Sequence, residues 1–153
     1  MQTPNHKFFL LKRKKQSQIT QSVAWYISCL LLTFHVQADN LTLPTDPVIA
    51  AGDINITSAL GQMQINQASQ SGIINWQSFS IGENASVNFN LPGKDSVAVN
   101  RVSGKEGSVI AGRLTSNGQV FVSNPNGILF TPKAAVETAG FLATVHQMTE
   151  PGE

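Results

Sequence analysis

The side chains that most often carry chemistry are few in this chain of 153 residues, and they lie far apart. His146 is the one histidine after residue 38, and Cys29 is the only cysteine. A zinc site or a Cys–His nucleophile needs at least two such side chains at a suitable spacing, and no pair meets that condition. No nucleophile elbow, phosphate-binding loop or dinucleotide fingerprint occurs either. We therefore expect no metal, no cofactor and no catalytic residue, and we interpret His146 as a partly exposed residue of a terminal strand.

Acidic side chains give a second test for an enzyme, because glycosidic chemistry needs paired carboxylates. In this chain they are isolated from one another in the sequence, as at Asp53, Glu83, Asp95, Glu106 and Glu137. Residues 39–153 hold nine acidic and five basic residues, so they provide no basic stripe for neutralising phosphates. We expect neither an enzyme nor a nucleic-acid-binding protein.

The densest local signal is Ser-Asn-Pro-Asn-Gly-Ile-Leu-Phe, at residues 123–130. Asn124 precedes a proline and is pushed toward extended backbone, while Pro125 fixes its own φ near about −65°. Asn126 and Gly127 suit the third and fourth positions of a type I turn. The run predicts a sharp corner between two strands. Corners of this composition are common in unrelated proteins, so by itself the run indicates only a turn.

Short apolar or alternating runs recur from residue 53 to residue 145, each ended by Gly, Asn, Pro or Ser. Such runs, with turn signals about every 8 to 12 residues, are typical of an all-β protein. The predicted strands are 54–57, 63–66, 73–81, 86–91, 96–102, 108–111, 119–123, 128–131 and 141–145. No window favours a helix. The best helical candidate, 133–144, contains Gly140 and β-branched residues, and we predict two short strands there.

The apolar pattern differs between runs. Residues 120–122 and 128–130 are apolar at every position, which predicts strands covered on both faces. The runs 86–90 and 96–100 alternate sharply, which predicts half-exposed strands. In these two runs, alternation places on one face Val87, Phe89, Val97 and Val99.

Two architectures fit these strands, a β-sandwich and a β-solenoid of stacked parallel coils. The solenoid is favoured by asparagine, of which there are eleven from Asp39 onward. In stacked coils each turn lies above the last, and asparagine tolerates left-handed backbone while its amide bonds the neighbouring turn. A sandwich uses such residues too, and it stays open as the alternative.

Residues 1–38 are unlike the rest and are predicted to be an extended signal peptide. They carry five basic residues and no acid, followed by an apolar run at 23–34 that is shorter than the about 20 residues of a membrane span. Val36 and Ala38 suit a cleavage site, so we expect the cut after Ala38 and export through the general secretion machinery. Cys29 would leave with the leader. A buried helix or a single anchor is the alternative.

Four motifs occur in order and together carry a resemblance. They are Asn-Trp-Gln-Ser-Phe-Ser-Ile-Gly at 75–82, Val-Ala-Val-Asn-Arg-Val at 97–102, Gly-Arg-Leu-Thr-Ser-Asn-Gly-Gln-Val-Phe-Val at 112–122, and the corner at 123–130. Over roughly residues 50–145 the chain resembles the N-terminal secretion domain, or haemagglutination activity domain, of filamentous-haemagglutinin-like exoproteins. These proteins leave Gram-negative bacteria by two-partner secretion.

The resemblance implies a right-handed parallel β-helix with an N-terminal capping sheet, and no enzyme. It implies that residues 39–153 are the N-terminal part of a secretion domain, truncated before the passenger of a large adhesin, haemolysin or contact-dependent toxin. The partner would be an outer-membrane β-barrel transporter that recognises the domain in the periplasm through its own periplasmic domains. The protein would be secreted or held at the cell surface. Any host-cell or carbohydrate receptor would be bound by the passenger.

The resemblance also assigns residues to a secretion motif, which the transporter reads. The family's two motifs fall on Asn124, Pro125, Asn126, Gly127 and Ile128, and on Asn100, Arg101 and Val102. The family's Asn-Pro-Asn-Leu motif is absent, which places the chain nearer the adhesin and haemolysin branch.

Four side chains have a structural interpretation beside the functional one. We expect Arg101 to serve the structure before any partner, Trp76 and Phe79 to pack in the core or cap, and Phe121 to be structural as well. Exposed strands could also pair with an edge of the transporter, with Trp76, Phe79 and Phe121 giving selectivity. The rival from another class is a stand-alone carbohydrate- or host-binding β-domain.

Overall fold

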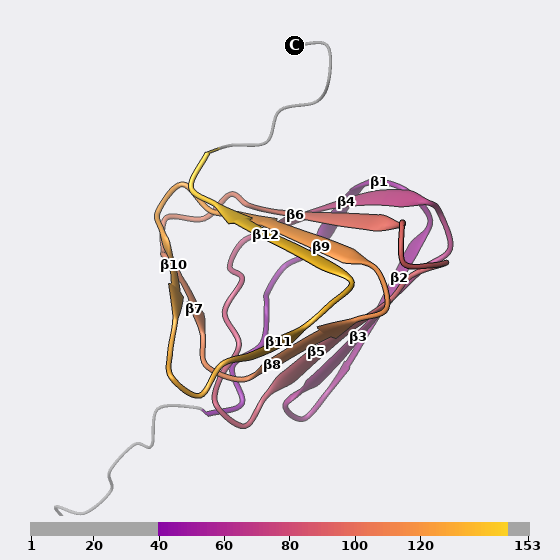
Figure 1. Cartoon of the computed structure of the whole chain (residues 1–153). Coiled ribbons are helices and arrows are strands. Elements are labelled where there is room, and N and C mark those ends of the chain that lie inside the picture. The colour runs from indigo at the N-terminus through magenta and orange to yellow at the C-terminus, as the bar shows by residue number, and fades with distance from the viewer. Residues whose placement is uncertain (1–39, 147–153) are drawn as a thin grey trace, which may run out of the picture. The chain divides into compact units, whose positions relative to one another are not determined.

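The computed structural model describes residues 40–146, and these residues wind into a three-sided β-solenoid (Figure 1). Residues 1–39 and 147–153, with the predicted signal peptide, lie outside the described residues. Three sheets form the three sides. Sheet I contains β1 (Val48–Ala51), β4 (Ser71–Trp76), β6 (Val97–Val102), β9 (Gln119–Ser123) and β12 (Gly140–Thr144). Sheet II contains β2 (Ile54–Ala59), β3 (Gln62–Gln67), β5 (Ser86–Asn90), β8 (Arg113–Ser116) and β11 (Ala135–Glu137). Sheet III contains β7 (Ser108–Ile110) and β10 (Ile128–Phe130).

Each coil runs from sheet II to sheet I and then to the third side. The first coil uses β3 and β4 and reaches the third side at Ile81, which forms a parallel bridge to Ile110. The second coil is β5–β6–β7, the third is β8–β9–β10, and the fourth is β11 and β12. Strands of successive coils pair in parallel, as in β4–β6–β9–β12. This pairing confirms the predicted right-handed parallel β-helix and excludes the β-sandwich.

The first coil is capped by the two N-terminal strands. β1 pairs with β4 and β2 pairs with β3, both antiparallel. The edges of sheets I and II at the first coil are therefore covered. β2 and β3 form a hairpin whose two-residue turn contains Gly61 at φ 68°, a left-handed conformation that glycine adopts without steric cost. The predicted N-terminal capping sheet is therefore confirmed.

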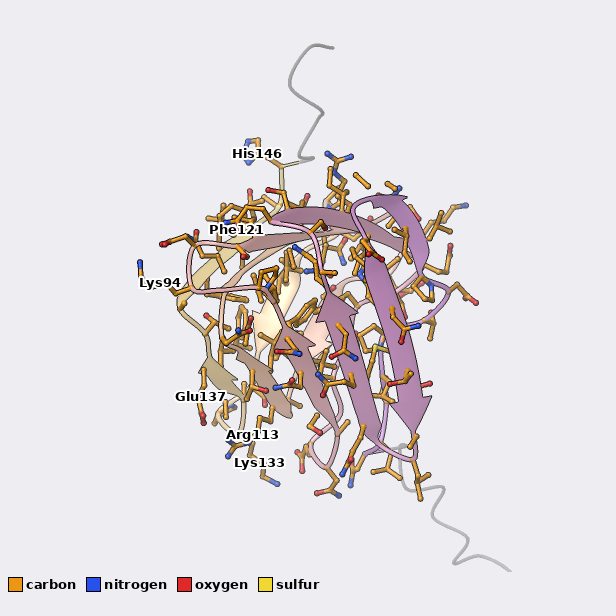
Figure 2. All side chains as sticks on the ribbon, turned by 90° about the vertical axis from the view of Figure 1, so that its right-hand side faces the viewer. Lys94, Arg113, Phe121, Lys133, Glu137 and His146 are labelled. Carbon is orange, nitrogen blue, oxygen red and sulfur yellow. The ribbon has the colours of Figure 1, made fainter. Side chains whose placement is uncertain are left out.

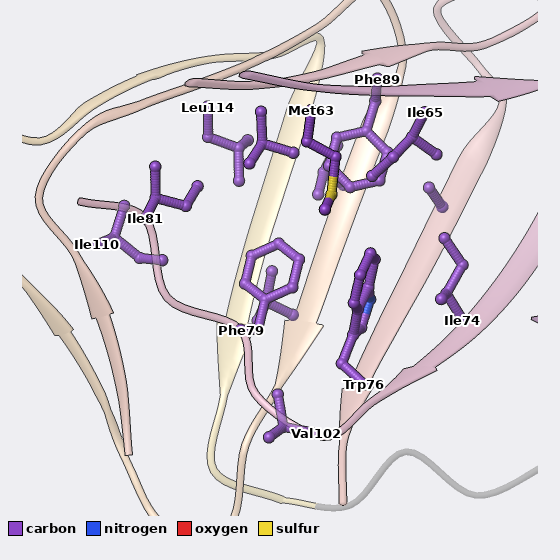
Figure 3. Packing of buried hydrophobic residues seen from close by; sticks show 14 of the residues in the cluster. Met63, Ile65, Ile74, Trp76, Phe79, Ile81, Phe89, Val102, Ile110 and Leu114 are labelled. Atoms are coloured by element: carbon purple, nitrogen blue, oxygen red, sulfur yellow. The ribbon is translucent and has the colours of Figure 1, made fainter. Parts of the chain in front are cut away.

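The core lies inside the coils, where every second residue of a strand points inward. In β3 and β4 the inward residues include Met63, Ile65, Ile74 and Trp76, all buried. Trp76 and Phe79 are fully buried and meet edge to face, with ring centroids 5.6 Å apart (Figure 3). Their predicted core packing is confirmed. Both side chains therefore lie away from any partner in the folded domain, and of the three proposed for selectivity only Phe121 is partly accessible.

Several strand predictions are confirmed, one is wrong in part, and two strands were not predicted. The segment 133–144 does form two short strands, β11 and β12. The predicted strand 73–81 is wrong in its second half, because β4 ends at Trp76 and the chain turns before Phe79. β1 and β8 were not anticipated. β8 reads Arg-Leu-Thr-Ser and has a single apolar residue, Leu114, which is buried.

Two predictions about strand faces are wrong. In β6 the inward residues are Ala98, Asn100 and Val102, whereas Val97 and Val99 lie half-buried on the outer face. Alternation misassigned this strand because Asn100 is polar yet buried. Residues 128–130 were expected to be covered on both faces, but Leu129 is 60% exposed and Phe130 is 40% exposed.

Candidate functional site

The corner after β9 is built by the side chain of Asn124. Its side chain lies between β9 and the preceding coil, fully buried. Asn124 Nδ2 donates to the carbonyl of Glu106 at 3.0 Å and to Ser108 Oγ at 2.9 Å. The backbone N–H of Gly127 donates to the carbonyl of Asn124 at 3.1 Å and closes the predicted turn. The corner of the third coil is therefore fastened onto the corner of the second.

Asn126 adds a second link in the same direction. Its Nδ2 donates to the carbonyl of Gly104 at 2.8 Å and to Asn124 Oδ1 at 3.1 Å, and its backbone N–H donates to the same Oδ1 at 2.9 Å. Pro125 and Asn126 are exposed at the turn. The prediction that asparagine amides bond the neighbouring turn is confirmed at this corner. An amide suits the position because one side chain both donates and accepts.

Asn100 lies in the core and links three coils. Trp76 Nε1 in the first coil donates to Asn100 Oδ1 at 2.9 Å. Asn100 Nδ2 donates to the carbonyl of Phe121 in the third coil at 3.2 Å and to the carbonyl of Ala98 at 3.3 Å. Asn100 is fully buried, and burial of an amide is tolerated because its donors and its acceptor are both used.

The other motif residues surround these amides. Arg101 is half-buried on the outer face of β6, where it lies between Asn75 of β4 and Ser123 of β9 in the strand register. Val102 is buried in the core. Ile128 is half-buried at the start of β10 and packs against the core cluster.

The structure brings the two motifs together at one edge of the solenoid. Asn100 pairs with Val122 and Arg101 pairs with Ser123 across β6 and β9, so the corner at Asn124 follows directly beside the Asn-Arg-Val run. The buried amides, however, face inward or toward the preceding corner. In the folded domain Pro125 and Asn126 are the exposed residues of the motif, and Arg101, Gly127 and Ile128 are partly exposed.

An apolar row on the outer face of sheet I was not anticipated from the sequence. The strand register aligns Ile73, Val99, Phe121 and Leu142 in successive coils. The first three are half-buried and Leu142 is 45% exposed. Phe121 thus lies on the outer face, as Figure 2 shows, and not in the core. The available signal was the unbroken apolar run at 120–122, which we interpreted as a strand covered on both faces.

Charged side chains form ion pairs at the surface. Lys133 Nζ lies 2.7 Å from Glu83 Oε2, and Arg113 Nη1 lies 2.9 Å from Glu137 Oε1. Figure 2 places Arg113, Lys133 and Glu137 near one another. Among residues 40–146, no three His, Cys, Asp or Glu side chains gather where they could hold a metal ion. His146 is exposed just after β12. Within the same residues, no helix has the length and apolar character needed to cross a membrane.

Comparison with known proteins places this architecture among secretion domains. Residues 39–150 match the family model of the TPS (two-partner secretion) secretion domain. Two curated relatives, both heme/hemopexin-binding proteins of Haemophilus influenzae, are 37% identical over 130 residues and 38% identical over 132 residues. Each match covers 83% of this chain, and the chain spans only 14% of the length of these relatives.

A solved structure shows the same fold. The HMW1 secretion domain from Haemophilus influenzae superposes with a TM-score of 0.67 at 31% sequence identity. The superposition covers 71% of this chain and 29% of that one.

Proposed function

The chain belongs to the TPS secretion domain family, and from that membership we propose that residues 39–153 are the export address of a larger exoprotein, an adhesin, a haemolysin or a contact-dependent toxin. Exoproteins of this family are secreted by Gram-negative bacteria with a cognate outer-membrane transporter as partner. The single observation that carries the proposal is the family match over residues 39–150, on a chain folded into the same solenoid. A stand-alone carbohydrate- or host-binding domain is not favoured by this match.

The route is part of the proposal. Residues 1–38 act as the signal peptide, which the general secretion machinery uses and which is removed after Ala38. The start of the family match at residue 39 supports that boundary. The mature chain then crosses the periplasm and meets the periplasmic domains of the transporter. It reaches the cell surface or the medium, where it folds.

The transporter reads the secretion motif before the motif folds. Asn100 and Asn124 are both 0% exposed, so a partner of the folded domain would touch neither side chain. In an unfolded segment both amides are free to bond a partner strand, as in recognition by strand addition. Folding afterwards turns the same amides inward, where they fasten coil to coil.

Folding at the surface suits the coil-by-coil architecture. Each coil contacts its neighbours through local pairing, so the solenoid can grow from the capped first coil without waiting for distant segments. As the chain folds outside the membrane, folding draws the part still threaded through the pore outward. This outward movement requires no nucleotide.

The test is secretion of the chain by cells that carry the cognate transporter. Asn124→Ala and Asn126→Ala are expected to lower the secreted amount several-fold. The matched control is Asn84→Ala. Asn84 is an exposed residue of the turn before β5, and among the described contacts it makes only a backbone hydrogen bond to Asn40. Secretion of both corner variants at the level of the control would remove these residues as determinants.

A binding measurement separates recognition from folding. The purified chain is presented to the isolated periplasmic domains of the transporter, either folded or freshly diluted from urea. We expect binding only by the diluted, still unfolded chain, and weaker binding by its Asn124→Ala variant. Equal binding by the folded chain would contradict recognition before folding.

A further inference from the structure

Two Asn-Gly dipeptides lie at corners of the third coil, Asn117–Gly118 between β8 and β9 and Asn126–Gly127 between β9 and β10. Glycine lacks a Cβ, so its backbone nitrogen is the least hindered nucleophile available to a preceding asparagine side chain. We propose that Asn117 and Asn126 are sites of spontaneous deamidation that unfolding opens and folding closes. The sites themselves do not depend on the proposed function.

The reaction needs water and no other reagent. The backbone nitrogen of the glycine loses its proton to water or hydroxide and attacks Cγ of the asparagine, and a new N–Cγ bond forms. The Cγ–Nδ2 bond breaks, and Nδ2 leaves as ammonia after taking up a proton. The resulting succinimide is opened by one water molecule at either carbonyl. The products are aspartate and isoaspartate, and no electron is gained or lost.

Hydrogen bonds of the fold restrain both reacting groups at Asn117. Its Oδ1 accepts from the backbone N–H of Leu91 at 2.8 Å, and its Nδ2 donates to the carbonyl of Leu91 at 2.7 Å. The attacking group is restrained too, because the N–H of Gly118 donates to Ser116 Oγ at 3.0 Å. The two bonds to Leu91 join the third coil to the second, so cyclisation requires the coils to separate at this corner, and the bond to Ser116 within the third coil must break as well.

Asn126 is restrained in the same manner. Its Nδ2 donates to the carbonyl of Gly104, and the N–H of Gly127 donates to the carbonyl of Asn124. Asn117 and Asn126 are both exposed. Water therefore reaches both side chains in the folded domain, and the protection comes from hydrogen bonding and not from exclusion of water.

The consequences of the reaction differ between the two corners. An aspartate at 117 would direct a carboxylate at the carbonyl of Leu91 and lose the donor. Isoaspartate would also lengthen the backbone at Gly118, which is buried and where even an added Cβ would lie 2.9 Å from the carbonyl oxygens of Gly93 and Ser96. Around Gly127 an added Cβ meets nothing within 4 Å. Deamidation at 117 is therefore the one that blocks stacking of the third coil.

In a secretion domain, the fraction of chains deamidated at Asn117 would therefore increase with the time that the chain spends unfolded. A chain that is deamidated at Asn117 while unfolded would lose the ability to complete its third coil. This consequence rests on the proposed function, whereas the chemistry is tested on the purified full chain without a transporter. Failure of the chemical test would leave the secretion proposal standing.

The first experiment compares rates. The full chain is incubated in a mildly alkaline buffer, either folded or in urea, and the products are quantified by peptide mass spectrometry and by enzymatic methylation of isoaspartate. In urea we expect both Asn-Gly sites to react well ahead of Asn84, which precedes alanine. In the folded chain both should slow by at least about tenfold, the factor given by an opening free energy of about 1.4 kcal/mol. Equal rates with and without urea would overturn the proposal.

The second experiment tests the unequal consequences. Asn117→Asp, Asn126→Asp and the control Asn84→Asp are refolded from urea, and the recovered β-structure is followed by circular dichroism. We expect the lowest recovery for Asn117→Asp, an intermediate value for Asn126→Asp and the parent value for Asn84→Asp. Parent-like recovery of Asn117→Asp would contradict a block at the third coil. If Asn117→Asp does not fold at all, the rate comparison on the parent chain still decides the chemistry.

Discussion

Asn100 and Asn124 are equally buried asparagines that join coils in two different regions. Asn100 lies among apolar side chains and accepts from an indole, while Asn124 lies in a corner where its partners are a backbone carbonyl and a serine hydroxyl. In the core a lost amide leaves partners that water does not reach. In the corner Ser108 is also buried, but the other partner is the carbonyl of Glu106, an exposed residue, and there water can replace the amide. The same residue type should therefore matter more in the strand than in the turn.

Removing the core amide should have the largest effect on stability. Asn100→Ala leaves Trp76 Nε1 without its acceptor and opens a cavity, so we expect a loss of about 3 kcal/mol in the free energy of unfolding. Urea unfolding followed by circular dichroism measures the loss. A matched control is Trp76→Phe in the Asn100→Leu background, in which both polar partners are gone and part of the loss should be recovered. A loss below that of Asn124→Ala would reverse the comparison.

The corner amide should come second. Asn124→Ala removes the bonds to Glu106 and Ser108 and the acceptor for the Asn126 N–H, and we expect a loss of about 2 kcal/mol. Asn124→Asp keeps the acceptor but buries a carboxylate that faces the carbonyl of Glu106, so at neutral pH its stability should not exceed that of Asn124→Ala. The same urea titration checks this order. Equal stability of the aspartate variant and the parent would mean that the donated bonds contribute nothing.

The exposed corner amide should matter less. Asn126→Ala loses the bond to the carbonyl of Gly104, which water can then solvate, and we expect a loss of about 1 kcal/mol. Hydrogen exchange of the backbone amides around Gly104 and at 124–127 provides a local measurement, since the two corners should separate there before the whole domain unfolds. Exchange that accelerates uniformly over the chain would instead assign Asn126 a global role.

Much of this fold could be predicted from the sequence because its turns are marked by particular residues. The run at 124–127 predicted the corner, and the spaced apolar runs predicted most strands. The face of β6 could not be predicted by alternation, because Ser96 and Asn100 are polar but buried with satisfied hydrogen bonds. Which side of a strand is inward depends there on partners in other coils, about 20 to 30 residues away in sequence, and no local rule contains them.

The candidate site was predicted only in part. The resemblance selected Asn100 and Asn124, and the structure locates Asn100 opposite Val122 in the paired strands β6 and β9 and Asn124 just after the end of β9. Their roles as links between coils depend on Trp76, Ser108 and the carbonyl of Glu106, which approach only through coil stacking. The exposure of side chains was also hard to predict from the local sequence. Leu129 lies in an apolar run typical of a core strand, yet it points outward on sheet III. The part of Asn100 and Asn124 in secretion stays a prediction.

The smallest effect should come from links made by charge. Arg113 and Glu137 join the third coil to the fourth, but their side chains are 56% and 62% exposed, so Glu137→Gln should cost less than about 0.5 kcal/mol. The cost of Glu137→Gln should shrink as salt is added, because dissolved ions screen exposed ion pairs. The screening length is about 10 Å at 0.1 M ionic strength and shortens as salt is added. The effect of Asn126→Ala should not change with salt, since both of its partners are neutral. Urea titrations of the two variants at low and high salt measure the difference, and a salt-independent loss for Glu137→Gln would mean that packing of the side chain, and not its charge, joins these coils.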